Sequence, residues 1–162
     1  MANYARVRTD NMLGIHRSAE LVSLMFMKDG VSAPIENGNF VLVGGYIEGE
    51  QDYREASVPA ADSALANIAL VAGVEVDKRE DYNSLAEYIN RAGVAFRGYR
   101  LHKHDCFSVT AEALSAEAEI AVGNIVELQA DTKAKVVASL TEGSTQIGTV
   151  MAIEGEWIVI EV

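Results

Sequence analysis

Short runs in which apolar and polar residues alternate make up most of the chain, and Gly, Asn, Asp and Pro residues separate them. Runs of about four to eight residues with this period of two, bounded by turn residues, are typical of β-strands that bury one face. In the second half of the chain they follow one another at short spacing, in segments 94–101, 106–114, 123–129, 134–140, 148–154 and 156–162. The pattern predicts a mainly β protein of the α+β class, with a small β-barrel or sandwich-like domain of short strands and one packed α-helix.

Several positions in this pattern predict turns or irregular strands. Asn37-Gly38 and Glu154-Gly155-Glu156 have the composition of tight turns, and Gly44-Gly45 permits a bulge or bend in an apolar strand. Segment 61–76 is ambiguous, because its alanines favour a helix whereas Ile68–Val71 suits a buried strand. We interpret it as a loop followed by a strand.

One segment has the period of a helix. Tyr82, Leu85 and Ile89 recur at helical spacing, acidic residues cluster at the start of the segment, and Gly93 suits its C-terminal end. We therefore expect an α-helix near residues 81–92 that packs on the β-rich domain.

The N-terminal residues 1–17 predict an extended arm that precedes a single β-rich domain at residues 18–162. The alternation in the first part of the arm puts two sets of side chains on opposite faces, namely Tyr4, Arg6 and Arg8 on one face and Ala5 and Val7 on the other. Such a segment can add a strand to an exposed sheet edge, either in a neighbouring protein or in its own domain. Both alternatives stay open. If the arm adds a strand to a neighbouring protein, we expect the domain to fold without residues 1–9.

The charge balance limits the classes of partner. With 24 acidic and 13 basic residues the chain carries a net charge of −11, which repels phosphate and argues against nucleic acid as a partner. Residues 91–103 are basic and contain no acid. We interpret them as a solvated face that pairs with nearby acids, with a charged partner surface as the alternative. No apolar run approaches the roughly 20 residues of a membrane helix, and no secretory apolar stretch opens the chain, so we expect cytoplasmic synthesis and no membrane partner.

The most reactive side chains of the sequence gather at residues 102–106. On a continuous strand His102, His104 and Cys106 would point to one face and offer three ligands to Zn²⁺, which usually takes four in structural sites. The chain has one other histidine and no second cysteine to complete the set. Because Cys106 opens an apolar strand, the alternative is a small buried hydrophobe without catalytic activity. We expect a protein that is not an enzyme.

Four segments spread along the chain resemble one group of proteins when they are taken together. They read MANYARVRT, IENGNFVLVGGYIEGEQDYREASVP, FRGYRLHKHDCFSVTAEAL and TQIGTVMAIEGEWIVIEV. They resemble the capsid decoration proteins, also called head auxiliary or cement proteins, of tailed bacteriophages. In that group residues 103–105 tend to read Lys-Gly-Asp, a turn before a strand. This sequence departs from the pattern at His104, and the resemblance implies that His102, His104 and Cys106 do not share a strand face.

The resemblance implies a non-enzymatic structural protein of the virion that needs no cofactor. Such a protein binds the outer capsid surface and stabilises contacts between subunits of the major capsid protein, and copies of itself on the capsid are a further partner to consider. We expect the arm to contact the capsid through Tyr4, Arg6, Val7 and Arg8.

Two other functions stay open from the residues alone. One is a small soluble β-barrel module that binds a metal or small ligand through His102, His104 and Cys106. The other is a different phage structural component, such as a tail or head-fibre protein, because β-rich folds serve many such roles.

Overall fold

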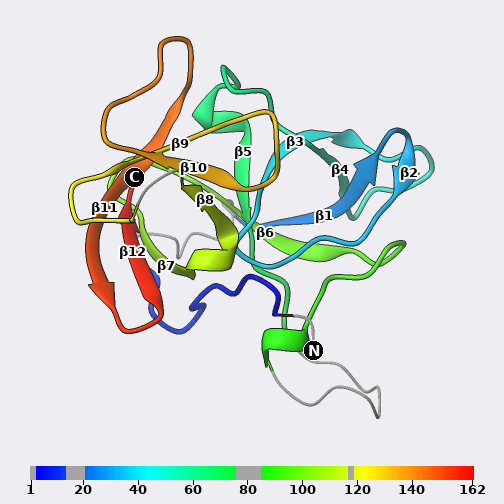
Figure 1. The fold of residues 1–162 in the computed structure, drawn as a ribbon. Helices are drawn as coiled ribbons and strands as arrows, with labels where there is room; N and C mark the ends of the chain where they lie inside the picture. The colour runs from blue at the N-terminus through cyan, green and yellow to red at the C-terminus, as the bar shows by residue number, and fades with distance from the viewer. Residues whose placement is uncertain (1–2, 14–20, 76–84, 117–118) are drawn as a thin grey trace.

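The computed structural model describes residues 3–13, 21–75, 85–116 and 119–162. Its strands form two six-stranded sheets that lie side by side (Figure 1). The mainly β class is therefore confirmed. Within the described residues, no helix has both the length and the apolar composition needed to cross a membrane.

The first sheet closes into a five-stranded barrel, because β1 pairs in parallel with β4 and antiparallel with β6. The short β2 extends the sheet beyond β1. The strands, in their order across the sheet, are β2 (Val31–Ser32), β1 (Leu21–Lys28), β4 (Arg54–Ser57), β3 (Phe40–Tyr46), β5 (Ile68–Val71) and β6 (Phe96–Arg100). We call this unit the barrel.

The second sheet stays open and curves into a half-barrel. All its pairings are antiparallel except that of β8 with β10. Its strands, in their order across the sheet, are β7 (Cys106–Thr110), β12 (Trp157–Glu161), β11 (Gln146–Glu154), β9 (Ile125–Glu127), β10 (Ala134–Val137) and β8 (Leu114–Ala116). The short 3₁₀ turns η2 (Leu65–Asn67), η3 (Leu85–Glu87) and η4 (Ala111–Ala113) connect strands or lie between them.

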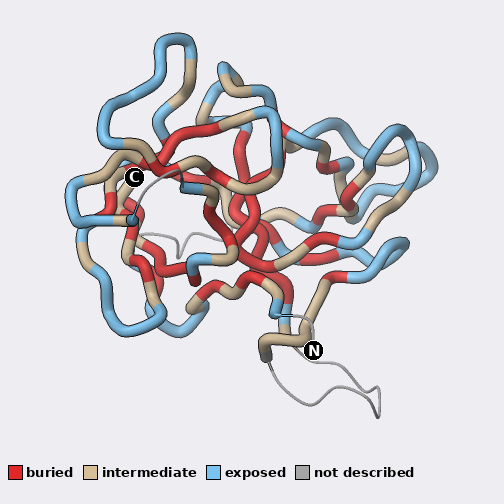
Figure 2. Tube along the Cα trace, in the orientation of Figure 1, coloured by how far each residue is buried: buried red, intermediate tan, exposed pale blue. Residues whose placement is uncertain are grey.

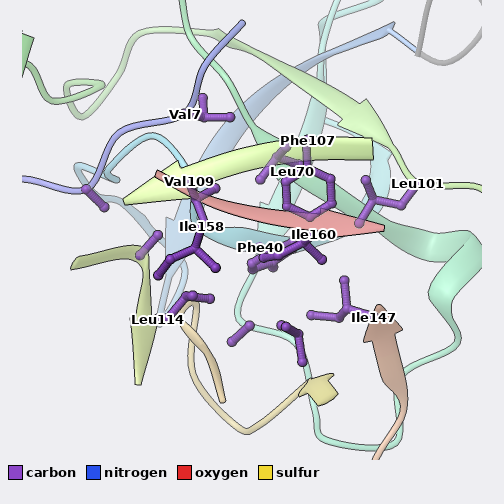
Figure 3. Packing of buried hydrophobic residues seen from close by; sticks show 14 of the residues in the cluster. Val7, Phe40, Leu70, Leu101, Phe107, Val109, Leu114, Ile147, Ile158 and Ile160 are labelled. Carbon is purple, nitrogen blue, oxygen red and sulfur yellow. The ribbon is translucent and has the colours of Figure 1, made fainter. Parts of the chain in front are cut away.

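A single large core joins the two units. Phe40 and Leu70 from the barrel pack with Phe107, Val109 and Ile160 from the half-barrel, and the rings of Phe40 and Phe107 lie 6.0 Å apart (Figure 3). Figure 2 shows this buried centre where the sheets meet, with the exposed loops at the periphery. The half-barrel therefore covers the outer face of the barrel at β3 and β5.

A second, smaller cluster fills the barrel itself and explains why β5 is entirely apolar. In β5, Ile68 and Leu70 belong to the shared core, whereas Ala69 and Val71 belong to the barrel cluster. All four are fully buried. Because side chains alternate along a strand, a strand between two cores must be apolar on both faces. The interpretation of segment 61–76 as a loop followed by a strand is confirmed.

Other local expectations also hold. Gly38 and Gly155 have positive φ angles of 82° and 64°, which the two tight turns require. The pairing of β3 with β4 shifts register between Val43 and Tyr46, so Gly44 and Gly45 lie in a bulge. The two turns therefore fall where glycine removes the steric cost of a positive φ angle.

The expected α-helix near 81–92 is not supported. Residues 81–84 lie outside the described residues, and the described part of the segment contains only the η3 turn. The reason lies in Asn90, which is buried and donates to the carbonyl of Ile35 (3.0 Å) and to Oδ1 of Asn37 (2.9 Å). An isolated bridge between Ile35 and Asn90 holds the chain extended there, so tertiary hydrogen bonds override the helical spacing of Leu85 and Ile89.

The N-terminal arm lies in the edge position of the half-barrel, beside β7. Val7 bridges Val109, and Arg8 N–H donates to the carbonyl of Ser108 at 2.9 Å. On the side facing the barrel, Ala5 N–H donates to Oε2 of Glu36 at 2.8 Å. Within the single chain, residues 4–8 thus complete their own sheet rather than a neighbour's.

The arm also contributes to the shared core through its inward side chains. Ala5, Val7 and Met12 are buried members of the large cluster. Removal of residues 1–9 would take two of them away and expose the edge of β7. The expectation that the domain folds unchanged without these residues therefore conflicts with the packing.

Candidate interface on the half-barrel

The three candidate metal ligands do not share a strand face. Lys103 and His104 form a turn, His104 has a φ of 74°, and its exposed side chain lies 3.6 Å from Glu161 through Nδ1. Asp105 accepts a hydrogen bond from the backbone N–H of His102 at 2.8 Å and closes this turn. The alignment of His102, His104 and Cys106 on one face therefore fails. Residues 3–13, 21–75, 85–116 and 119–162 contain no group of three or more side chains able to hold a metal ion.

Cys106 begins β7 and is partly buried. Its backbone N–H donates to the carbonyl of Leu13 at 2.9 Å, and Leu13 N–H donates back at 2.9 Å. Burial, with a smaller contribution from the negative charge of Glu161, raises the pKa of the Cys106 thiol. The neutral thiol is favoured as a result, which is the opposite of what an activated nucleophile requires.

The arm, β7, β12 and β11 together form one outward-facing surface, which we call the arm face. Its residues follow from the strand register. The bridge between Val7 and Val109 sets Arg6 opposite Thr110, whose N–H donates to the carbonyl of Arg6 at 3.0 Å. Thr110 in turn pairs with Trp157, and Trp157 pairs with Glu154. Directly paired residues lie on the same side of a sheet. One row of side chains therefore runs across four segments that are far apart in the sequence.

Trp157 is the centre of the arm face, and two guanidinium groups lie near its ring. The distances from the Cζ atoms of Arg6 and Arg8 to the ring centroid are 5.6 and 5.8 Å, within the range of cation–π contacts. Arg6 binds both carboxylate oxygens of Glu156, at 2.5 and 3.3 Å, and Arg8 binds Asp10 at 3.1 Å. These ion pairs orient the two guanidinium groups before any partner arrives.

The surroundings of the arm face are acidic. The carboxylates that interact with the two guanidinium groups are Asp10, Glu75, Glu112, Glu154 and Glu156. Burial alone would raise the pKa of Glu112, but hydrogen bonds from Thr110 and Asn3 and the charge of Arg6 outweigh it and lower that pKa. Burial raises the pKa of Glu75, against a hydrogen bond from Asn37. Among the described residues, more carboxylates than guanidinium groups thus take part in this cluster beside Trp157.

The four predicted capsid-contact residues differ in how accessible they are. Val7 is 3% exposed and faces the core, so it cannot touch a partner unless the arm moves. The side chains of Arg6 and Arg8 are 18% and 30% exposed and engaged in the ion pairs above. Tyr4 is partly buried, and its N–H donates to the carbonyl of Ala86 at 2.8 Å. Arg6, Arg8 and Tyr4 therefore remain accessible at the surface, and Val7 does not.

Sequence reasoning did not assign Trp157 to the arm face. A signal for it was present, because the tight turn at Glu154-Gly155-Glu156 fixes the start of the last strand, and alternation along WIVIEV then puts Trp157 and Val159 on one face. What alternation did not reveal is which sheet face is outward. Ile158 and Ile160 are buried, whereas Trp157 and Val159 are only partly buried.

Comparison of the chain with protein-family models, with curated proteins and with solved structures gives no match.

Proposed function

We propose that this protein is a non-enzymatic capsid decoration protein of a tailed bacteriophage. It binds the outside of the capsid through the arm face and stabilises contacts between subunits of the major capsid protein. The resemblance of four segments to that group supports this function. The structural observation that supports it best is Trp157 on the outward side of a sheet, with the guanidinium groups of Arg6 and Arg8 near its ring.

The physical argument concerns binding energy. Trp and Arg are the residue types that most often dominate protein–protein interfaces. Here both guanidinium groups are already held by Glu156 and Asp10, so little side-chain entropy is lost when a partner binds. The acidic surroundings favour a capsid surface with basic residues around the contact, which speeds association and selects the orientation.

The test uses expanded phage heads that lack the protein, from the phage whose genome encodes it. Purified protein is mixed with the heads, and the bound fraction is measured by co-sedimentation over a concentration series. Trp157→Ala is the test variant. The matched control is Tyr46→Ala, because Tyr46 is an exposed aromatic residue on the barrel with the guanidinium of Arg54 at 4.2 Å from its ring.

Loss of a central aromatic contact of about 2 kcal/mol or more weakens binding at least roughly 30-fold. We expect this loss for Trp157→Ala and unchanged binding for Tyr46→Ala, with both variants folded by circular dichroism. Wild-type protein that stays in the supernatant with such heads would refute the decoration function. Equal binding by both variants would remove the arm face from the contact.

A further inference from the structure

A second surface feature has chemistry opposite to that of the arm face. It is a cavity of about 580 Å³ between β1, the start of β6 and the segments 73–74 and 88–91, which we call the barrel groove. Val22 and Phe96 line it and also pack in the barrel cluster. At its rim lie the exposed side chains of Val74 (56%) and Val94 (55%). What distinguishes these two valines from singly exposed ones is that they lie together at an apolar cavity, an arrangement typical of binding sites.

The charge of the barrel groove differs from that of the rest of the chain. Arg91 and Arg97 line it, and among the described residues no acid does. This occurs in a chain with 24 acidic and 13 basic residues. Arg97 is exposed, and its strand is held by backbone pairing, since its carbonyl accepts from Ala72 N–H at 2.9 Å. The groove thus combines apolar walls with the exposed guanidinium group of Arg97.

We propose that the barrel groove binds an extended segment of a partner protein that alternates apolar and acidic residues. Its apolar side chains cover Val74, Val94 and the Phe96 wall, and its carboxylates pair with Arg97. A purely anionic polymer such as nucleic acid fits less well, because the walls are apolar and the whole chain carries a charge of −11.

The groove also adjoins the arm face. Val74 lines the groove, and the next residue, Glu75, lines a small cavity with Arg6, Arg8 and Trp157. A partner seated on the arm face is therefore close to the groove. If the partner is the capsid subunit, the inference rests on the proposed function, and the groove is a second contact with that subunit. At this second contact the protein supplies the positive charge and the capsid segment supplies the negative charge. Two linked contacts bind more tightly than either alone.

The first experiment tests the groove without heads. Fluorescein-labelled peptides with the repeat Glu-Val and the repeat Lys-Val are titrated with the protein, and fluorescence polarisation is measured. We expect the Glu-Val peptide to bind at least tenfold more tightly than the Lys-Val peptide. Arg97→Glu and Val94→Glu each abolish this preference, and Arg97→Lys retains it. The matched control is Val122→Glu, because Val122 is a valine on the half-barrel with 64% exposure. Equal binding of the two peptides by wild-type protein overturns the proposal.

The second experiment separates this proposal from the proposed function. Co-sedimentation with heads is repeated with Arg97→Glu and Val122→Glu, and we expect at least tenfold weaker binding for the first alone. Heads that bind wild type and Arg97→Glu equally overturn the groove as a capsid contact and leave the decoration function intact. If heads bind no form of the protein, the decoration function fails, and the peptide titration still decides whether the groove binds acidic segments.

Discussion

Val7→Ala tests whether the arm is docked on its own domain when the protein is free. Val7 is 3% exposed and belongs to the shared core, opposite Val109. The substitution removes the equivalent of two methylene groups, about 1.6 kcal/mol of transfer free energy. The cavity left behind raises the total to roughly 2–3 kcal/mol. For a chain of this size that loss lowers the melting temperature by roughly 4–12 °C.

Urea denaturation measures this loss, followed by circular dichroism and by the fluorescence of Trp157. Trp157 is the chain's only tryptophan, and Arg6 and Arg8 of the arm lie over its ring, so its emission reports the arm directly. Val122→Ala is the control and should change the free energy of unfolding by less than about 0.5 kcal/mol, because Val122 is exposed. If Val7→Ala costs no more than the control, the arm is not packed in the free protein, and residues 4–8 are available to a neighbour's sheet.

Three further predictions concern single side chains. His104→Gly should stabilise the fold by up to about 1 kcal/mol in thermal denaturation, because glycine takes a φ of 74° without the steric cost that a Cβ atom adds. A loss of stability would contradict this. Iodoacetamide should alkylate Cys106 more slowly in native than in urea-unfolded protein, because burial raises the thiol pKa. Because the pKa of this thiol is higher in the folded than in the unfolded chain, the free energy of unfolding also depends on pH. The contribution of the neutral thiol is fully present below the ordinary thiol pKa and is lost as the pH rises through the raised value. Glu127→Ala should cost about 2 kcal/mol in urea denaturation, since the buried carboxylate accepts from Thr141 N–H (2.8 Å) and Oγ1 (2.7 Å); Glu127→Gln keeps an acceptor and should cost less.

Local features were predictable wherever the local sequence decides them. The last two strands follow from alternation, and their turn follows from the freedom of Gly155 to take a positive φ. The Gly44-Gly45 pair indicated the bulge in β3. The turn at Lys103-His104 was predictable from the resemblance, which implies a glycine there. Strand spacing also predicted a barrel or sandwich, and the structure combines a closed barrel with an open half-barrel.

Two features that the sequence did not reveal depend on contacts between residues far apart in the chain. Asn90 pairs with Ile35 and Asn37, more than 50 positions away, and so extends a segment that has the spacing of a helix. Barrel closure depends on β1 pairing with both β4 and β6, and no local pattern in Leu21–Lys28 specifies two partners. The alignment of His102 with Cys106 failed because a strand was assumed to continue through a turn.

The period-two alternation of the arm gives one segment two roles at once. Ala5 and Val7 complete the shared core, while Arg6 and Arg8 lie on the outward side against Trp157. Deleting the arm therefore removes core packing and candidate capsid contacts together. If head binding were lost after the deletion, the loss could come from a destabilised fold or from the missing contacts. Substitutions confined to one face do separate them. Val7→Ala should lower stability and leave the outward side chains in place, whereas Trp157→Ala should leave the buried face of the arm packed and lower binding.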